Sequence, residues 1–203
     1  QSARESARRS SLKSEMPKEI LPAGAEGPGV SAPKQLPKAR LASIAADITL
    51  TPKLSLGTAT PESIYEPHFA GRIDATGPGD EKGDCEIELP LPPQITSLAD
   101  LSINAANQPS EAVTLRDGKL VWHGTLPAQR TTLKIAYTAV GKGLYELSAA
   151  PGGLLDEYKV SLPAKGSDVR LLELSLQPTS IERTGGRRTD SWKYSRLSVG
   201  RPG

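Results

Sequence analysis

From residue 41 onward, apolar and polar residues alternate along most of the chain. A period of two places every second side chain on one face of a strand. The alternating stretches are 44–56, 69–75, 87–91, 101–103, 113–122, 133–139, 145–147, 158–162, 172–176 and 192–194. Roughly ten short strands at this spacing are typical of antiparallel β architecture. The pattern predicts an all-β fold, an antiparallel β-sandwich, over residues 41–203.

Prolines and turn residues refine this prediction. Pro52 and Pro178 interrupt or end strands, which favours a sandwich with exposed edges over a closed barrel. Residues 97–101 could instead form one helical turn. No longer helical period follows residue 41, so a βαβ fold is not expected.

Three glycine-containing turns predict hairpins. Asp117-Gly118 lies between two alternating segments, and this dipeptide is typical of a type I′ turn. The segment 141–143, Gly-Lys-Gly, predicts a second hairpin that returns into Tyr145. Gly185-Gly186 predicts a third turn, before the last strand.

Residues 1–40 have a different composition. Ser2 and Glu5 fit a capping box, so residues 1–16 are expected to form a short helix that ends at Pro17. This helix is either a solvated, fraying segment or the outer end of a membrane helix. Residues 17–40 are rich in proline and glycine and predict an extended spacer. The expected domains are therefore a stalk, 1–40, and a β domain, 41–203.

Charge and cysteine content narrow the class of protein. The chain of 203 residues carries a net charge of +2, divided into +4 for residues 1–40 and −2 for the rest. A β domain at −2 lacks the basic surface that nucleic acid requires, so no nucleic-acid partner is expected. Cys85 is the single cysteine, which excludes an internal disulfide. Since the chain begins with Gln1 and contains no apolar run of membrane length, we expect a fragment whose membrane contact lies in flanking segments.

Candidate chemistry is sparse. Asp80, Glu81 and Asp84 form an acidic turn that could hold calcium, although its spacing differs from an EF-hand and a solvated turn is the simpler interpretation. The two histidines, His68 and His123, show no zinc-binding spacing. We predict no catalytic residue, no cofactor and no metal beyond this calcium candidate.

A second charged cluster lies near the C-terminal end. Arg183, Arg187 and Arg188 surround Gly185-Gly186. They predict either a solvated hairpin tip or a contact with an anion or a lipid headgroup. Because aromatic residues are few and lie at alternating positions, they are expected to pack in the core rather than to bind sugars.

Three stretches together resemble the extracytoplasmic domain of CreD-like bacterial inner-membrane proteins. They are 89–92 (LPLP) with 120–126 (LVWHGTL), then 135–141 (IAYTAVG) with Tyr145, and 173–179 (ELSLQPT) with 192–197 (WKYSRL) and 200–203 (GRPG). The resemblance covers about residues 85–203. It implies a large loop between membrane helices, on the periplasmic face, with a role in envelope maintenance and no catalytic residues to carry over. The basic stretch 4–13 departs from the expected charge pattern, because positive residues favour the inner side.

These observations support a non-enzymatic periplasmic domain of a membrane-anchored bacterial protein, with a binding or sensory role and an unknown protein partner. An alternative is a secreted carbohydrate-binding or carbohydrate-active β-sandwich, which needs exposed aromatics or paired carboxylates. A third is an assembly unit that pairs through open sheet edges.

Overall fold

The computed structural model describes residues 35–55, 62–147, 153–165 and 176–199. They belong to the compact unit Gln35–Gly203. Within them the fold is all-β, and no helix occurs. The predicted helix at 1–16, the spacer as far as residue 34, and the expected strand at 172–176, except for Leu176, lie outside the described residues.

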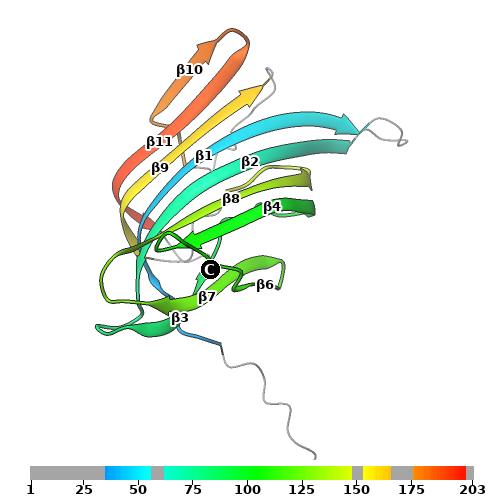
Figure 1. Ribbon diagram of the computed structural model, residues 1–203. Coiled ribbons are helices and arrows are strands. Elements are labelled where there is room, and N and C mark those ends of the chain that lie inside the picture. Colours follow the sequence, from blue (N-terminus) through cyan, green and yellow to red (C-terminus); the bar gives the residue numbers. More distant parts are fainter. Residues whose placement is uncertain (1–34, 56–61, 148–152, 166–175, 200–203) are drawn as a thin grey trace, which may run out of the picture. The chain divides into compact units, whose positions relative to one another are not determined.

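Eleven strands are described, and Figure 1 labels most of them. They are β1 (Arg40–Ser55), β2 (Glu62–Thr76), β3 (Gly83–Glu88), β4 (Ile95–Ala105), β5 (Gln108–Pro109), β6 (Val113–Arg116), β7 (Lys119–Leu126), β8 (Thr131–Lys142), β9 (Gly153–Lys165), β10 (Ser180–Thr184) and β11 (Arg187–Val199). An eight-stranded sheet has the order β10-β11-β9-β1-β2-β8-β4-β5, and a three-stranded sheet has the order β3-β7-β6.

The predicted antiparallel arrangement holds for every described strand pair except one. β1 pairs with β9 in parallel, with Ile44 beside Tyr158 and Ala46 beside Val160. β8 is antiparallel to β2, and β2 is antiparallel to β1, so β8 runs in the same direction as β1 and therefore as β9. β8 and β9 are consecutive in the chain. Two parallel strands need a crossover connection rather than a tight turn. A wholly antiparallel fold was therefore a wrong prediction, since alternation within strands carries no information on their direction.

Two of the three predicted hairpins are confirmed. Arg116 pairs with Lys119 across Asp117-Gly118, whose φ angles of 52° and 74° are those of a left-handed turn. β10 and β11 meet at Gly185-Gly186, with φ angles of 57° and 73°.

The prediction of a hairpin at 141–143 is wrong. β8 runs through Lys142 between β2 and β4, and Tyr145 and Leu147 lie outside any strand. The neighbours of β8 come from earlier in the chain, so the following segment cannot pair beside it. The helical turn considered for 97–101 is also wrong, because these residues belong to β4, which pairs with β8 through an irregular register.

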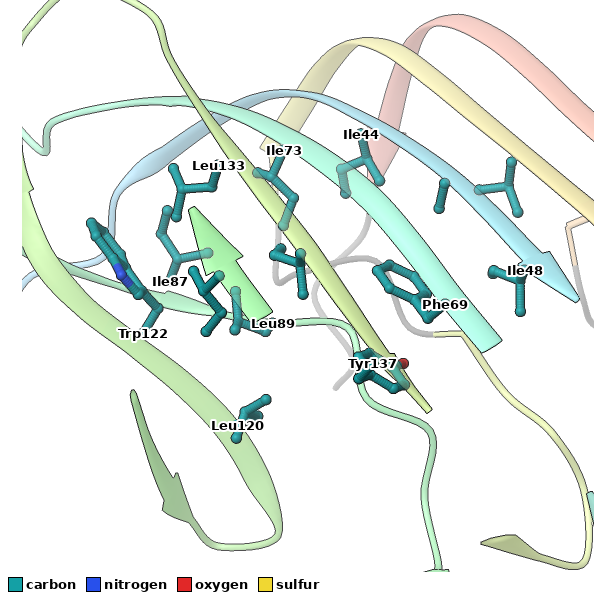
Figure 2. Packing of buried hydrophobic residues seen from close by; sticks show 14 of the residues in the cluster. Ile44, Ile48, Phe69, Ile73, Ile87, Leu89, Leu120, Trp122, Leu133 and Tyr137 are labelled. Atoms are coloured by element: carbon teal, nitrogen blue, oxygen red, sulfur yellow. The ribbon is translucent and has the colours of Figure 1, made fainter. Parts of the chain in front are cut away.

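Alternate side chains of the long strands build one apolar core (Figure 2). Ile44 and Ile48 of β1, Phe69 and Ile73 of β2, and Leu133 of β8 are buried on one face of the eight-stranded sheet. From the small sheet, the buried members are Cys85, Ile87, Leu120, Trp122 and Leu126. Both sheets thus contribute to the same hydrophobic cluster, which fixes the opposite face of the large sheet as its outer face.

Tyrosine hydroxyl groups hold the proline-rich segment 89–93 against this core. Tyr137 Oη donates to the carbonyl oxygen of Pro90 at 2.9 Å, and Tyr65 Oη donates to that of Pro93 at 2.6 Å. The Tyr137 ring also stacks on Phe69, with centroids 4.9 Å apart. Because prolines have no N–H, this segment cannot pair as a regular strand. Its buried carbonyl groups still need hydrogen-bond donors, and the tyrosine side chains provide them. The chain passing between the two sheets is fixed by these bonds.

The end of the expected spacer takes part in the fold. Ala39 N donates to Glu86 O, and Glu86 N donates to Pro37 O, each at 3.0 Å. Lys38 therefore bridges in parallel to the edge of β3. An edge strand exposes unpaired backbone groups, and this segment satisfies part of them.

Candidate functional site

An open hollow of about 510 Å³ lies on the outer face of the eight-stranded sheet, over β1, β2, β8 and β4. Its floor consists of short side chains at neighbouring outer positions: Ala45, Ala70, Ser102 and Ala136. In the register, Ser102 lies opposite Ala136, and Ala136 lies opposite Ala70. Long side chains flank these positions, so the lack of bulk at the centre leaves the hollow.

Besides Ser102, four polar side chains line the hollow. Arg72 on β2 lies directly opposite Lys134 on β8, which in turn lies opposite Asn104 on β4. Asp47 on β1 pairs with Ala70, so it lies diagonally to Arg72. Directly opposed side chains on a sheet have Cβ atoms about 4.5–5.5 Å apart. The row from Arg72 to Asn104 therefore presents three side chains with N–H donors across three adjacent strands.

The charged side chains in the hollow differ from those beside it in their ion pairing. On the same outer face, Lys53 forms an ion pair with Glu66, and Lys159 forms one with Glu157 at 2.6 Å. By contrast, Asp47, Arg72 and Lys134 take part in no ion pair within the described ranges. Lys134 Nζ donates a hydrogen bond to the side-chain oxygen of Asn107, at 3.2 Å.

A hydrogen-bonded row borders the hollow on one side. Ser43 Oγ donates to Asp74 Oδ2 at 2.7 Å, and Thr132 Oγ1 donates to Asp74 Oδ1 at 2.6 Å. Partial burial acts to raise the pKa of Asp74. The two hydrogen bonds, with the charges of Arg72 and Arg130, outweigh it and hold the pKa below the ordinary value. The row thus fixes a carboxylate beside Arg72.

His68 borders the hollow on the other side. Sequence analysis left it unassigned, and it lies in β2, exposed on the outer face. Its Nδ1 lies 3.1 Å from Thr138 Oγ1, and its Nε2 lies 3.4 Å from Glu66 Oε1. Hydrogen bonding and the charge of Lys53 lower the pKa of Glu66, with a smaller contribution from His68. These contacts make His68 part of a polar row rather than a lone ligand.

The acidic turn and the second histidine lie elsewhere. Asp80 and Glu81 are exposed between β2 and β3, and Asp84 accepts a hydrogen bond from Thr125. Among the described residues, no group of three acidic, histidine or cysteine side chains converges to hold a metal ion. His123 Nε2 lies 2.7 Å from Thr114 Oγ1, on the face of β7 opposite to Trp122.

The arginine cluster lies at the β10–β11 hairpin, as expected. Arg183 pairs with Arg188 across the hairpin, while Arg187 is exposed beside the turn. Arg188 donates through Nε and Nη2 to Asp190 Oδ1, at 3.0 and 2.9 Å, and Asp190 is fully buried. Arg188 thus binds a buried carboxylate, whereas Arg183 and Arg187 are the exposed arginines of the cluster.

Each tryptophan side chain donates a hydrogen bond from its indole N–H to another part of the fold. Trp122 is buried, and its Nε1 donates to Ser110 Oγ at 3.0 Å. Trp192 Nε1 donates to the carbonyl oxygen of Leu176 at 2.7 Å, and Tyr194 Oη donates to that of Gln177. The prediction that these aromatics pack against the core is confirmed.

Sequence reasoning missed the hollow. Its residues are alanines and polar residues at the outward positions of strands whose inward positions were assigned to the core. A signal was present, since Ala45, Ala70 and Ala136 are small where neighbouring outer positions carry long side chains. Their convergence depends on strand order and register, which alternation does not supply.

Comparisons with known proteins place the chain in no family. No family model and no curated protein matches it. A proposed nutrient-binding protein from Legionella pneumophila aligns with a TM-score of 0.43 and 11% identity, over 80% of this chain and 64% of that one.

Two further solved structures show similar values. An M1 zinc metallopeptidase from Deinococcus radiodurans aligns with a TM-score of 0.44 and 11% identity, over 80% of this chain and 40% of that one. A proposed protease from Parabacteroides distasonis aligns with a TM-score of 0.33 and 12% identity, over 79% and 36%. The chain spans less than two thirds of the length of these proteins. Likenesses this distant carry no argument about this chain.

Proposed function

We propose that the chain is a β-sandwich domain of a membrane-anchored bacterial protein, placed on the extracytoplasmic face of the inner membrane. Its role there is binding or sensing, in support of envelope maintenance, rather than catalysis. The observation that carries the binding role is the hollow on the outer face of the eight-stranded sheet, whose charged side chains form no ion pair with any residue that the structure describes.

The hollow has the properties of a preformed binding surface. Its volume falls within the roughly 300–1,000 Å³ of small-molecule sites. Its residues come from four adjacent strands, and each of these strands also contributes buried side chains to the core, which holds the positions of the polar groups. Sites built on strands hold their geometry better than sites on loops. A ligand would therefore meet an arrangement that needs little reorganisation.

The placement rests on the resemblance of residues 85–203 to CreD-like domains. The segments that carry it include Trp122 and Tyr137, which pack in the core, and Pro90, whose carbonyl accepts the Tyr137 hydrogen bond. No helix in the described part of the chain is long and apolar enough to cross a bilayer.

The carbohydrate alternative would use an aromatic platform. Trp122 is buried, and Trp192 is engaged with the backbone at Leu176, so the described aromatics support the fold. The hollow is lined by aliphatic and polar side chains instead. We therefore favour a small polar ligand over a stacked sugar.

Labelling of the intact parent protein tests the placement. Ser97 is exposed on β4, whereas the native Cys85 is fully buried. We expect a Ser97→Cys variant in spheroplasts to react with a membrane-impermeant maleimide, while the parent with Cys85 alone stays unlabelled. Reaction only after the inner membrane is permeabilised would contradict the extracytoplasmic placement.

A blocked hollow tests the binding role. Ala136 and Ala99 are both exposed on the large sheet, but only Ala136 lines the hollow. In a thermal-shift panel of small polar compounds, we expect at least one to raise the Tm of the wild type and of Ala99→Phe, but not of Ala136→Phe. Equal shifts for all three proteins, or none for any, would contradict binding in the hollow.

A further inference from the structure

We infer that the hollow takes a small organic anion, whose carboxylate or phosphate group lies between Arg72 and Lys134. This inference rests on the proposed binding role of the hollow and specifies the chemistry of its ligand. The two cations lie directly opposite each other on β2 and β8. Like charges directly opposite each other destabilise a sheet. A bound anion converts this repulsion into two attractive contacts.

Arg72 and Lys134 differ from the neighbouring cations in their lack of a carboxylate partner among the described residues. Neighbouring cations on the same face have carboxylate partners, as Lys53 has Glu66 and Lys159 has Glu157. Arg72 and Lys134 form no ion pair with any described residue, although Asp74, which accepts hydrogen bonds from Ser43 and Thr132, feels the charge of Arg72. Both cations line the hollow, and Lys134 Nζ, which donates one hydrogen bond to Asn107 Oδ1, retains further N–H donors for a ligand.

The floor of the hollow admits an anionic group. Ala70 and Ala136 lie one position beyond the two cations on their face of the strands, and neither side chain extends past Cβ. Asn104 continues the row on β4 and offers an amide donor. A guanidinium, an ammonium and an amide on adjacent strands match a planar carboxylate or a phosphate, because both accept several N–H bonds at once.

Asp47 restricts the ligand to a small anion. It lies diagonally to Arg72 and presents a negative charge toward the same hollow. A long polyanion crossing the sheet would meet this carboxylate. A small ligand can place its anionic end on the cations and a hydroxyl or ammonium group at Asp47.

An NMR titration of the β domain within the full 203-residue chain tests the inference. The probes are inorganic phosphate and acetate at constant ionic strength, with chloride as the control for screening. We expect amide shifts confined to residues 70–72, 102–104 and 134–136 with phosphate or acetate. The anion that binds more tightly identifies the ligand as a phosphate ester or a carboxylate. The same shifts with chloride would overturn the inference.

Two double variants make the test specific. Arg72→Gln with Lys134→Gln should weaken anion binding at least tenfold. Lys53→Gln with Lys142→Gln, which also removes two positive charges but from lysines that are paired with Glu66 and Glu62 and do not line the hollow, should leave it unchanged. Unchanged binding in the first variant, or loss confined to the second, would overturn the inference.

The outcome separates this inference from the proposed function. If a panel compound is blocked by Ala136→Phe but binds the Arg72→Gln, Lys134→Gln variant as tightly as the wild type, the hollow is a binding site for a neutral ligand and the inference fails alone. If Ala136→Phe leaves phosphate, acetate and every panel compound bound as in the wild type, both fail.

Discussion

The two faces of the eight-stranded sheet are made by alternate residues of the same strands, yet they have opposite properties. The inner face carries Leu133, Ile135 and Tyr137 of β8, all buried in the shared core. The outer face of the same strand carries Lys134 and Ala136, both exposed. Because adjacent residues serve different faces, stability and binding can change independently along a single strand.

This separation has an energetic basis. On the inner face, a lost methylene removes close contacts and leaves a cavity. On the outer face, water replaces a lost contact, and exposed ion pairs contribute only about 0–1 kcal/mol each. The protein can therefore hold two opposed cations on the outer face at little cost, since the inner face supplies most of the stability.

The largest effect is expected for Leu133, which is fully buried. Leu133→Ala should lower the free energy of unfolding by about 2–5 kcal/mol, because the surrounding core cannot collapse around the missing side chain. Its sequence neighbour provides the matched control, since Lys134→Ala should stay within about 0.5 kcal/mol of the wild type. Denaturant unfolding measures both. Equal losses in the two variants would refute the division between the faces.

A smaller effect is expected for the Tyr137 hydroxyl. Tyr137→Phe keeps the stacking on Phe69 but loses the hydrogen bond to Pro90 O, which should cost about 0.5–1.5 kcal/mol at pH 7.

Alkaline unfolding sharpens this prediction. Burial raises the pKa of Tyr137 and raises that of Tyr158 to about 12. A tyrosine whose pKa is raised in the folded protein contributes to the free energy of unfolding at pH values below its ordinary pKa of about 10. This contribution is lost as the pH rises toward the pKa of the folded state. Tyr137→Phe lacks one such contribution, so its deficit should shrink between about pH 10 and 12. A deficit that grows over this range would contradict the assigned burial.

The smallest effect is expected at Asp74, on the border of the hollow. Its pKa is lowered in the fold, so its contribution to stability is present above the ordinary value of 3.8 and is lost as the pH falls through the folded value. Asp74→Asn should be slightly less stable at pH 7, and the difference should disappear in strong acid. Thr132→Ala, which removes one donor, should reproduce part of this effect. A difference that is independent of pH would show that the carboxylate charge is not stabilised by the fold.

Local patterns predicted the elements well but not all of their connections. The Asp117-Gly118 hairpin follows from two adjacent residues that accept a positive φ, so the sequence is sufficient to predict it. The Gly-Lys-Gly segment at 141–143 is also rich in turn residues, but β8 is already paired on both sides by β2 and β4. A tight turn there would need a free edge, which the tertiary structure does not offer.

The candidate site shows the same limit. The arginines at 183, 187 and 188 were visible as a cluster because they are close in sequence. Arg72 and Lys134 are 62 positions apart in the chain and become neighbours only through the pairing of β2 with β8. The carboxylate of Asp190, which engages Arg188, likewise could not be recognised as buried before the strand was placed.

The amino-acid order alone determines which side chains of each strand turn inward, because the two-residue period is a property of the backbone within one strand. It also determines the tight turns, through residues that tolerate a left-handed backbone. Strand order, the parallel contact of β1 with β9, and the meeting of two cations over a floor of alanines arise only when distant segments pair. Those pairings depend on the free energy of the whole sheet and its core, to which every strand contributes at once.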